Sequence, residues 1–161
     1  QKSIAADLEN FESLGELSVV EPGEDVWAAA DIVKRIIEQN DIAFTAVGID
    51  PANNAPDFAD ALEEMGLDED RIFAVGQGYK LLASYQQLER RLASGRLYHA
   101  DQQILKWCVM NAQQSAKGLV TKAASPRKID SLVALATAGQ ALISGPDAGG
   151  FDASAMAGGG W

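Results

Sequence analysis

An aspartate at the end of an apolar run is the first residue of this sequence that could do chemistry. Asp50 directly follows residues 43–49, a short, β-leaning apolar run that is typical of a buried strand. Pro51 has no backbone N–H to donate to a ladder, so the strand should end there. Reactive groups collect at the carboxyl ends of strands in α/β sheets, where a carboxylate can bind Mg²⁺ or Mn²⁺. The alternative is an ordinary Asp-Pro turn.

A second aspartate, Asp130, stands at the start of the last helix that the sequence predicts, over residues 129–143. One interpretation is a helix cap or a first-turn acid that complements the helix dipole. The other is a metal ligand, because acids from a strand end and a helix start could converge on one ion.

His99 is the only histidine and could be a proton shuttle, a metal ligand or a structural residue. Serine-nucleophile chemistry would need it as a partner, but no serine lies in a Gly-x-Ser-x-Gly elbow. The sequence has no phosphate-loop motif, so no ATP site of that kind is expected. No Cys and His residues have zinc-site spacing.

Charge is distributed unevenly along a chain whose net charge is −10. Residues 1–70 carry 18 acidic and 3 basic side chains, whereas residues 71–130 carry 3 acidic and 10 basic ones. Such asymmetry indicates either a local surface for an anionic partner or ordinary solvated surface.

Size and composition favour one folded domain. The chain has 161 residues, 47% of them hydrophobic, and no apolar run long enough to span a bilayer, so no membrane partner is expected. Its single cysteine, Cys108, cannot form an intramolecular disulfide and lies in an apolar stretch, which predicts a buried thiol.

The pattern of apolar residues and breakers predicts helices alternating with a few short strands, which is an α/β domain. We expect helices over 5–14, 24–39, 56–65, 79–93, 101–111 (with Asp101 as a candidate cap) and 129–143, strands over 17–20, 43–49 and 71–75, an extended segment at 97–99, and a hairpin or irregular segment over 113–123. So few strands suggest that part of the sheet precedes Gln1. Residues 145–161 lack periodicity and should form a flexible Gly/Ala-rich tail after a domain of residues 1–144.

The order of these pieces resembles the C-terminal nuclease half of bacteriophage large terminases. The resemblance covers roughly residues 5–144, and its motifs are individually weak but occur in the family's order and spacing. The motifs are Phe11–Gly23 (a helix, a strand and a Pro-Gly turn), Val47-Gly48-Ile49-Asp50-Pro51, Val75-Gly76-Gln77-Gly78, Ala93–His99 followed by Ile104–Trp107 and Asn111-Ala112, and Lys128-Ile129-Asp130 with Val133-Ala134.

This resemblance implies a ribonuclease-H-like mixed sheet flanked by helices, and an endonuclease that cuts concatemeric viral DNA with two Mg²⁺ or Mn²⁺ ions. Asp50 and Asp130 would be catalytic metal ligands, Lys128 would lie near the scissile phosphate or the two acids, and His99 could support the site. Double-stranded DNA would be gripped through its backbone by Arg90, Arg91, Arg96, Lys106, Lys117, Lys122 and Arg127. The resemblance also implies portal and small-terminase partners in the cytoplasm of a bacterial host.

The sequence departs from the family at its beginning. The family's first carboxylate lies on the first strand, upstream of the residues present here, and Asp7 falls in an expected helix. The ATPase half is absent as well. We therefore expect a truncated nuclease domain that binds metal weakly and cuts DNA poorly alone. Two other functions stay open: a non-catalytic module that docks on DNA or the portal, and a small-molecule enzyme with Asp50 as base.

Overall fold

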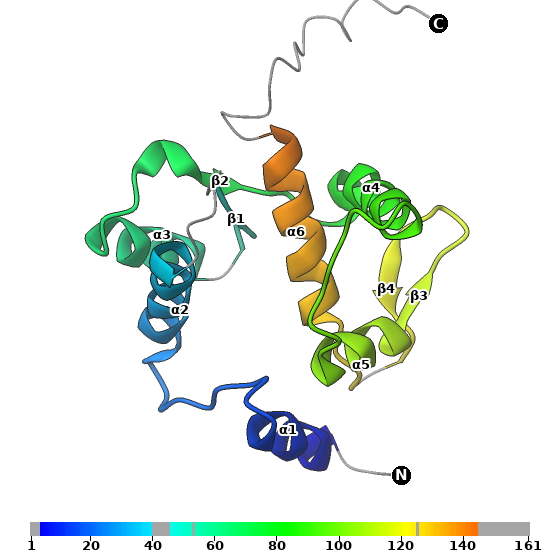
Figure 1. Cartoon of the computed structure of the whole chain (residues 1–161), viewed down its shortest axis with the longest axis horizontal. Helices are drawn as coiled ribbons and strands as arrows, with labels where there is room; N and C mark the ends of the chain where they lie inside the picture. The colour runs from blue at the N-terminus through cyan, green and yellow to red at the C-terminus, as the bar shows by residue number, and fades with distance from the viewer. Residues whose placement is uncertain (1–3, 40–45, 53, 125, 145–161) are drawn as a thin grey trace, which may run out of the picture.

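Helices and very short strands alternate along the chain (Figure 1). The computed structural model describes residues 4–39, 46–52, 54–124 and 126–144. The elements are α1 (Ile4–Ser13), α2 (Asp25–Gln39), β1 (Val47–Ile49), α3 (Ala55–Glu64), η1 (Glu69–Arg71), β2 (Ile72–Ala74), η2 (Gly78–Leu81), α4 (Leu82–Ala93), α5 (Gln103–Asn111), β3 (Ala112–Gln114), β4 (Val120–Lys122) and α6 (Asp130–Ser144). All six expected helices are present within a few residues of their predicted bounds, and none of the described helices could cross a membrane. The expected tail lies outside the described residues.

A two-stranded parallel sheet of β1 and β2 lies between helices on its two sides (Figure 1). On one side, Val47 and Ile72 pack against a core cluster of α2 and α3 formed by Ala30, Ala61 and Leu62. On the other side the sheet meets α6, since a Cβ at Gly48 would touch that helix. Helices on both faces explain why these strands are short, apolar runs rather than alternating ones.

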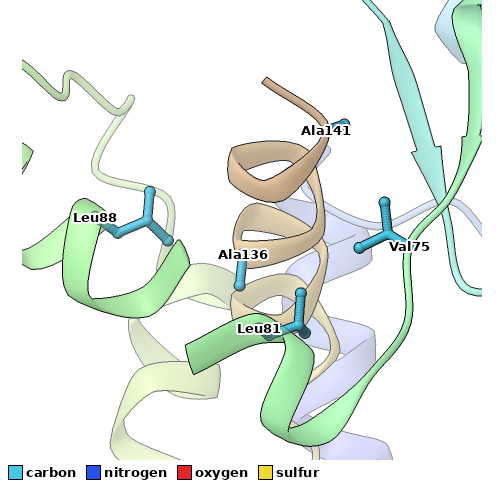
Figure 2. Close-up of a cluster of buried hydrophobic side chains, with 5 residues drawn as sticks. All are labelled: Val75, Leu81, Leu88, Ala136 and Ala141. Carbon is cyan, nitrogen blue, oxygen red and sulfur yellow. The ribbon is translucent and has the colours of Figure 1, made fainter. Parts of the chain in front are cut away.

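The helix α6 is the centre of the second core cluster. Figure 2 shows Ala136 and Ala141 of α6 with Val75, Leu81 and Leu88 around them, and all five are at most 9% exposed. Val75 follows β2 and Leu88 belongs to α4. The cluster therefore packs α6 against the end of the parallel sheet on one side and against α4 on the other. Small alanines on α6 let both neighbours approach closely.

The helices α4 and α6 approach each other closely. The Ser84 hydroxyl, fully buried, donates to the backbone oxygen of Ala136 at 2.6 Å. A Cβ at Gly139 would lie 2.6 Å from the same hydroxyl oxygen. Glycine is therefore required at that position because of the close contact, although it is a poor helix former.

A long-range carboxylate caps α5, which corrects the prediction of Asp101 in that role. Glu16 accepts hydrogen bonds from the backbone N–H groups of Gln103 at 3.0 Å and Ile104 at 2.8 Å. Asp101 instead adopts a left-handed conformation with φ 55°, and no cap bond comes from the Gln102 side chain. A carboxylate at a helix N-terminus satisfies unpaired donors and complements the dipole, which stabilises a helix by about 1 kcal/mol.

The expected hairpin is confirmed, whereas the strand expected over residues 17–20 is not formed. β3 and β4 pair antiparallel, from Ala112 opposite Lys122 to Gln114 opposite Val120, and Gly118 (φ 81°) allows the turn between them. Residues 17–20 and 97–99 are described without strand pairing. Their apolar β-branched or aromatic residues fit an extended chain, but none of the described strands pairs with either segment to form a ladder. Cys108 is 2% exposed, as predicted.

Candidate functional site

Asp50 ends the parallel sheet at its carboxyl edge, and its side chain is exposed. Its Oδ1 accepts a 3.1 Å hydrogen bond from the backbone N–H of Ala52, so the Asp-Pro turn is formed. An ionised carboxylate has about four lone-pair sites. One backbone hydrogen bond therefore does not prevent it from ligating a cation, and the two interpretations of Asp50 are compatible.

The strand β1 runs toward the beginning of α6. A Cβ at Gly48 would lie 3.0 Å from both the Ala141 Cβ and the Thr137 backbone oxygen, so strand and helix are in contact there. Val75, after the parallel neighbour β2, packs with Ala141, and Gln77 further along donates to the Thr137 hydroxyl at 3.4 Å. The segment from Val75 to Gln77 thus runs along α6 from its C-terminal turns toward its N-terminal turns. Because β1 is parallel to β2, it has the same direction.

Asp130 lies on the face of α6 that meets β1. It is the exposed first residue of the helix, and Thr137 and Ala141 follow it at i+7 and i+11, which places all three on one stripe. Asp50 stands two residues beyond Gly48, about 7 Å along the strand and, by alternation, on the same side of the sheet. Both aspartates therefore lie on the strand side of α6, toward its N-terminal end.

Carboxylate oxygens such as those of Asp50 and Asp130 are suitable ligands for a hard divalent cation. Mg²⁺ is usually bound through one or two carboxylates, with water and substrate phosphate oxygens completing its octahedron. Within the described residues, no group of three or more His, Cys, Asp or Glu side chains could hold a metal ion. Asp50 and Asp130 alone would therefore fill only part of a coordination sphere, and other oxygens would have to complete it.

A buried amide holds the segment that leads into Asp130. Asn111, 4% exposed at the end of α5, donates from Nδ2 to the Lys128 backbone oxygen at 3.1 Å. Its Oδ1 accepts from Arg127 Nη1 at 3.1 Å, and its backbone oxygen accepts from the Ala123 N–H at 2.8 Å. The sequence motif contained Asn111 but assigned it no role, because only the fold shows which segment it contacts.

Comparison with known proteins identifies the family of this chain. A family model described as "Terminase large subunit, endonuclease domain" matches residues 17–144. This chain belongs to that family. A comparison with curated proteins finds no match.

The fold of this terminase endonuclease domain is shared with a solved structure, the crystal structure of the HK97 bacteriophage large terminase. The two match with a TM-score of 0.56 and 23% sequence identity, over 72% of this chain and 24% of that chain. The match confirms the expected ribonuclease-H-like α/β fold, for which the short sheets described here are incomplete. The domain thus corresponds to about a quarter of that protein.

His99 lies apart from the two aspartates. It is exposed, its Nδ1 accepts a 3.1 Å hydrogen bond from the Asp101 N–H, and it lines an apolar cleft of about 730 Å³ between α4, α5, the hairpin and α6. The cleft meets α6 through Leu132 and Leu135, whose positions on the helical wheel face away from the β1 contact. Burial also raises the pKa of Tyr85 in the same cleft, because an apolar environment disfavours the phenolate.

Eight basic residues of the endonuclease domain lie on or beside α4, α5, the hairpin and the segment that leads into α6 (Figure 1). Arg90 and Arg91 lie in the last turn of α4, Lys106 lies on α5 and Lys122 on β4. Arg96 lies just after α4, Lys117 in the hairpin turn, and Arg127 and Lys128 just before α6; of all eight, only Arg91 is not exposed. The basic part of the sequence thus gathers on neighbouring elements, whereas the acidic N-terminal part is shared between α2 and α3 on one side and α1, which is followed by Glu16, the residue that caps α5.

Proposed function

We propose that this domain cuts concatemeric viral DNA during genome packaging, by divalent-metal-dependent hydrolysis of phosphodiester bonds. The observation that carries the proposal is the close contact of β1 with α6, the two elements at whose ends Asp50 and Asp130 stand, in a member of the terminase endonuclease family. Two bound Mg²⁺ or Mn²⁺ ions would supply activation of a water molecule and stabilisation of the leaving oxygen.

The domain's own residues have separate tasks in this proposal. Asp50 and Asp130 hold the ions at the sheet edge. Lys128 is exposed two residues before Asp130, where its ammonium can bind the scissile phosphate as a point charge. We assign His99 no part at this centre, because the cleft that it lines meets α6 through Leu132 and Leu135, whose helical positions face away from the β1 contact.

The metal site is tested by Mn²⁺ titration of the chain, followed through paramagnetic broadening of its backbone NMR signals. We expect the amide signals of Ile49, Ala52 and Ser131 to broaden first, because they are next to the two carboxylates in sequence. Mg²⁺, added in excess, should restore them by competition. Earliest broadening in the acidic helix α3 instead, with these signals unaffected, would remove the support for the site.

Double-stranded DNA would be bound by the eight basic residues through phosphate contacts. Replacing the two hairpin lysines, Lys117→Ala with Lys122→Ala, should lower the slope of log affinity against log salt by about 2, since each phosphate contact contributes roughly 0.9. Fluorescence anisotropy of a labelled duplex at several salt concentrations measures this slope. The matched control is Lys34→Ala with Arg35→Ala, which removes the same charge from α2. Equal slopes for the two double variants would argue against a DNA-contacting hairpin.

A second candidate function is non-catalytic docking on DNA or on a packaging partner such as the portal or the small terminase subunit, in the cytoplasm of a bacterial host. The apolar cleft favours it, because Tyr98, Met110 and Val109 line the cleft and remain at least 50% exposed. This function predicts intact partner binding when the aspartates are replaced, whereas the endonuclease function predicts loss of cleavage.

A further inference from the structure

We propose that Asn111 is a positioning residue of the metal centre, which fixes the place of Asp130 through the backbone of Lys128. The inference rests on the proposed metal-dependent function. It assigns a specific task to a residue that touches neither ion nor DNA.

The chain entering α6 is held at consecutive residues. The Lys128 oxygen is bound by the Asn111 amide, and the next side chain, Ile129, is 7% exposed. The Ile129 oxygen then accepts the Val133 N–H at 3.0 Å, which begins the helical hydrogen bonding. The hydrogen bond at Lys128 and the burial of Ile129 thus hold the two residues before Asp130. The Cα of Asp130 therefore has little freedom to move.

The same amide joins this segment to the hairpin. The Asn111 backbone oxygen accepts a hydrogen bond from the Ala123 N–H. The end of the hairpin and the segment before α6 are therefore both hydrogen-bonded to the same buried residue. Buried amides with satisfied donor and acceptor groups are rigid, and their loss leaves neighbouring polar groups unpaired. Removing this amide should therefore loosen Asp130 relative to Asp50, which is fixed separately by the contact of β1 with α6.

The test is Asn111→Leu, which keeps the number and branching of the side-chain heavy atoms, adds no charge and removes both side-chain hydrogen bonds. The Mn²⁺ concentration that half-broadens the Ser131 signal should rise about 10-fold, the lower range measured for residues that orient metal ligands. The matched control is Gln113→Leu. It removes the hydrogen bond of an exposed side-chain amide to the Lys122 oxygen at 3.3 Å and should leave the Mn²⁺ midpoint of Ser131 unchanged. Thermal unfolding of each variant shows that the folded protein is being titrated.

The outcomes are distinct. A folded Asn111→Leu variant with the wild-type midpoint overturns the inference, even if its melting temperature falls, because a merely structural role would lower stability alone. If the variant does not fold, the wild-type chain is titrated with Mg²⁺. If the Asn111 side-chain amide signals shift at the same Mg²⁺ concentration as the Ser131 signal, the inference is supported. If the Asn111 amide signals do not move, it is overturned. If wild-type Ile49 and Ser131 do not respond to Mn²⁺, the proposed metal function fails first.

Discussion

Replacing either Asp50 or Asp130 by asparagine should reduce Mg²⁺-dependent DNA cleavage by a terminase large subunit carrying this domain by about 1000-fold or more. A divalent ion contributes several kcal/mol of charge stabilisation to such a reaction, and asparagine removes the anionic oxygen that holds the ion. The measurement is nicking and linearisation of a supercoiled plasmid over time. Because the two carboxylates act as a unit, the double variant should be little worse than either single one.

The matched control for these variants is Asp57→Asn. Asp57 is an exposed acid in the first turn of α3, as Asp130 is in the first turn of α6, so the change in charge and in helix-dipole interaction is the same. Its cleavage rate should stay within a factor of two of wild type, a limit that corresponds to about 0.4 kcal/mol. Undiminished cleavage by Asp50→Asn and Asp130→Asn would exclude the catalytic assignment and leave the docking function.

Gly48→Val should be the most destabilising of the substitutions considered for this domain. The new Cβ would lie 3.0 Å from Val75 Cγ2, from the Ala141 Cβ and from the Thr137 backbone oxygen, before its two methyl groups are placed. Overpacking of this kind costs about 3 kcal/mol. For a chain of 161 residues that corresponds to a melting temperature lower by about 6–12 °C.

Circular dichroism melting curves measure this change. The control is Ala74→Val, which adds the same two methyl groups to the neighbouring strand at an exposed position and should shift the melting temperature by at most about 2 °C. Since Gly48 also sets the distance from β1 to α6, folded Gly48→Val protein should bind Mn²⁺ more weakly. A melting temperature equal to that of Ala74→Val would mean that the strand and helix are not closely packed there.

Local patterns were sufficient to predict the helices of this domain. Periodic apolar residues placed α2 and α6, and the breakers Pro51 and Gly66 marked where β1 and α3 end, because these signals act within a few residues. Strands were harder to predict. Residues 17–20 have the composition of a strand, yet a strand needs a partner to satisfy its backbone, and the sequence does not say whether one is near.

The candidate site divides in the same way. The sequence identified Asp50 and Asp130 by their places after a strand and before a helix, and the family motifs supported both. Only the tertiary structure decided that β1 runs toward the beginning of α6, that His99 lies on the other side of that helix, and that Glu16 rather than Asp101 caps α5. Each of these depends on segments tens of residues apart, and short-range periodicity carries no information about which of them pack together.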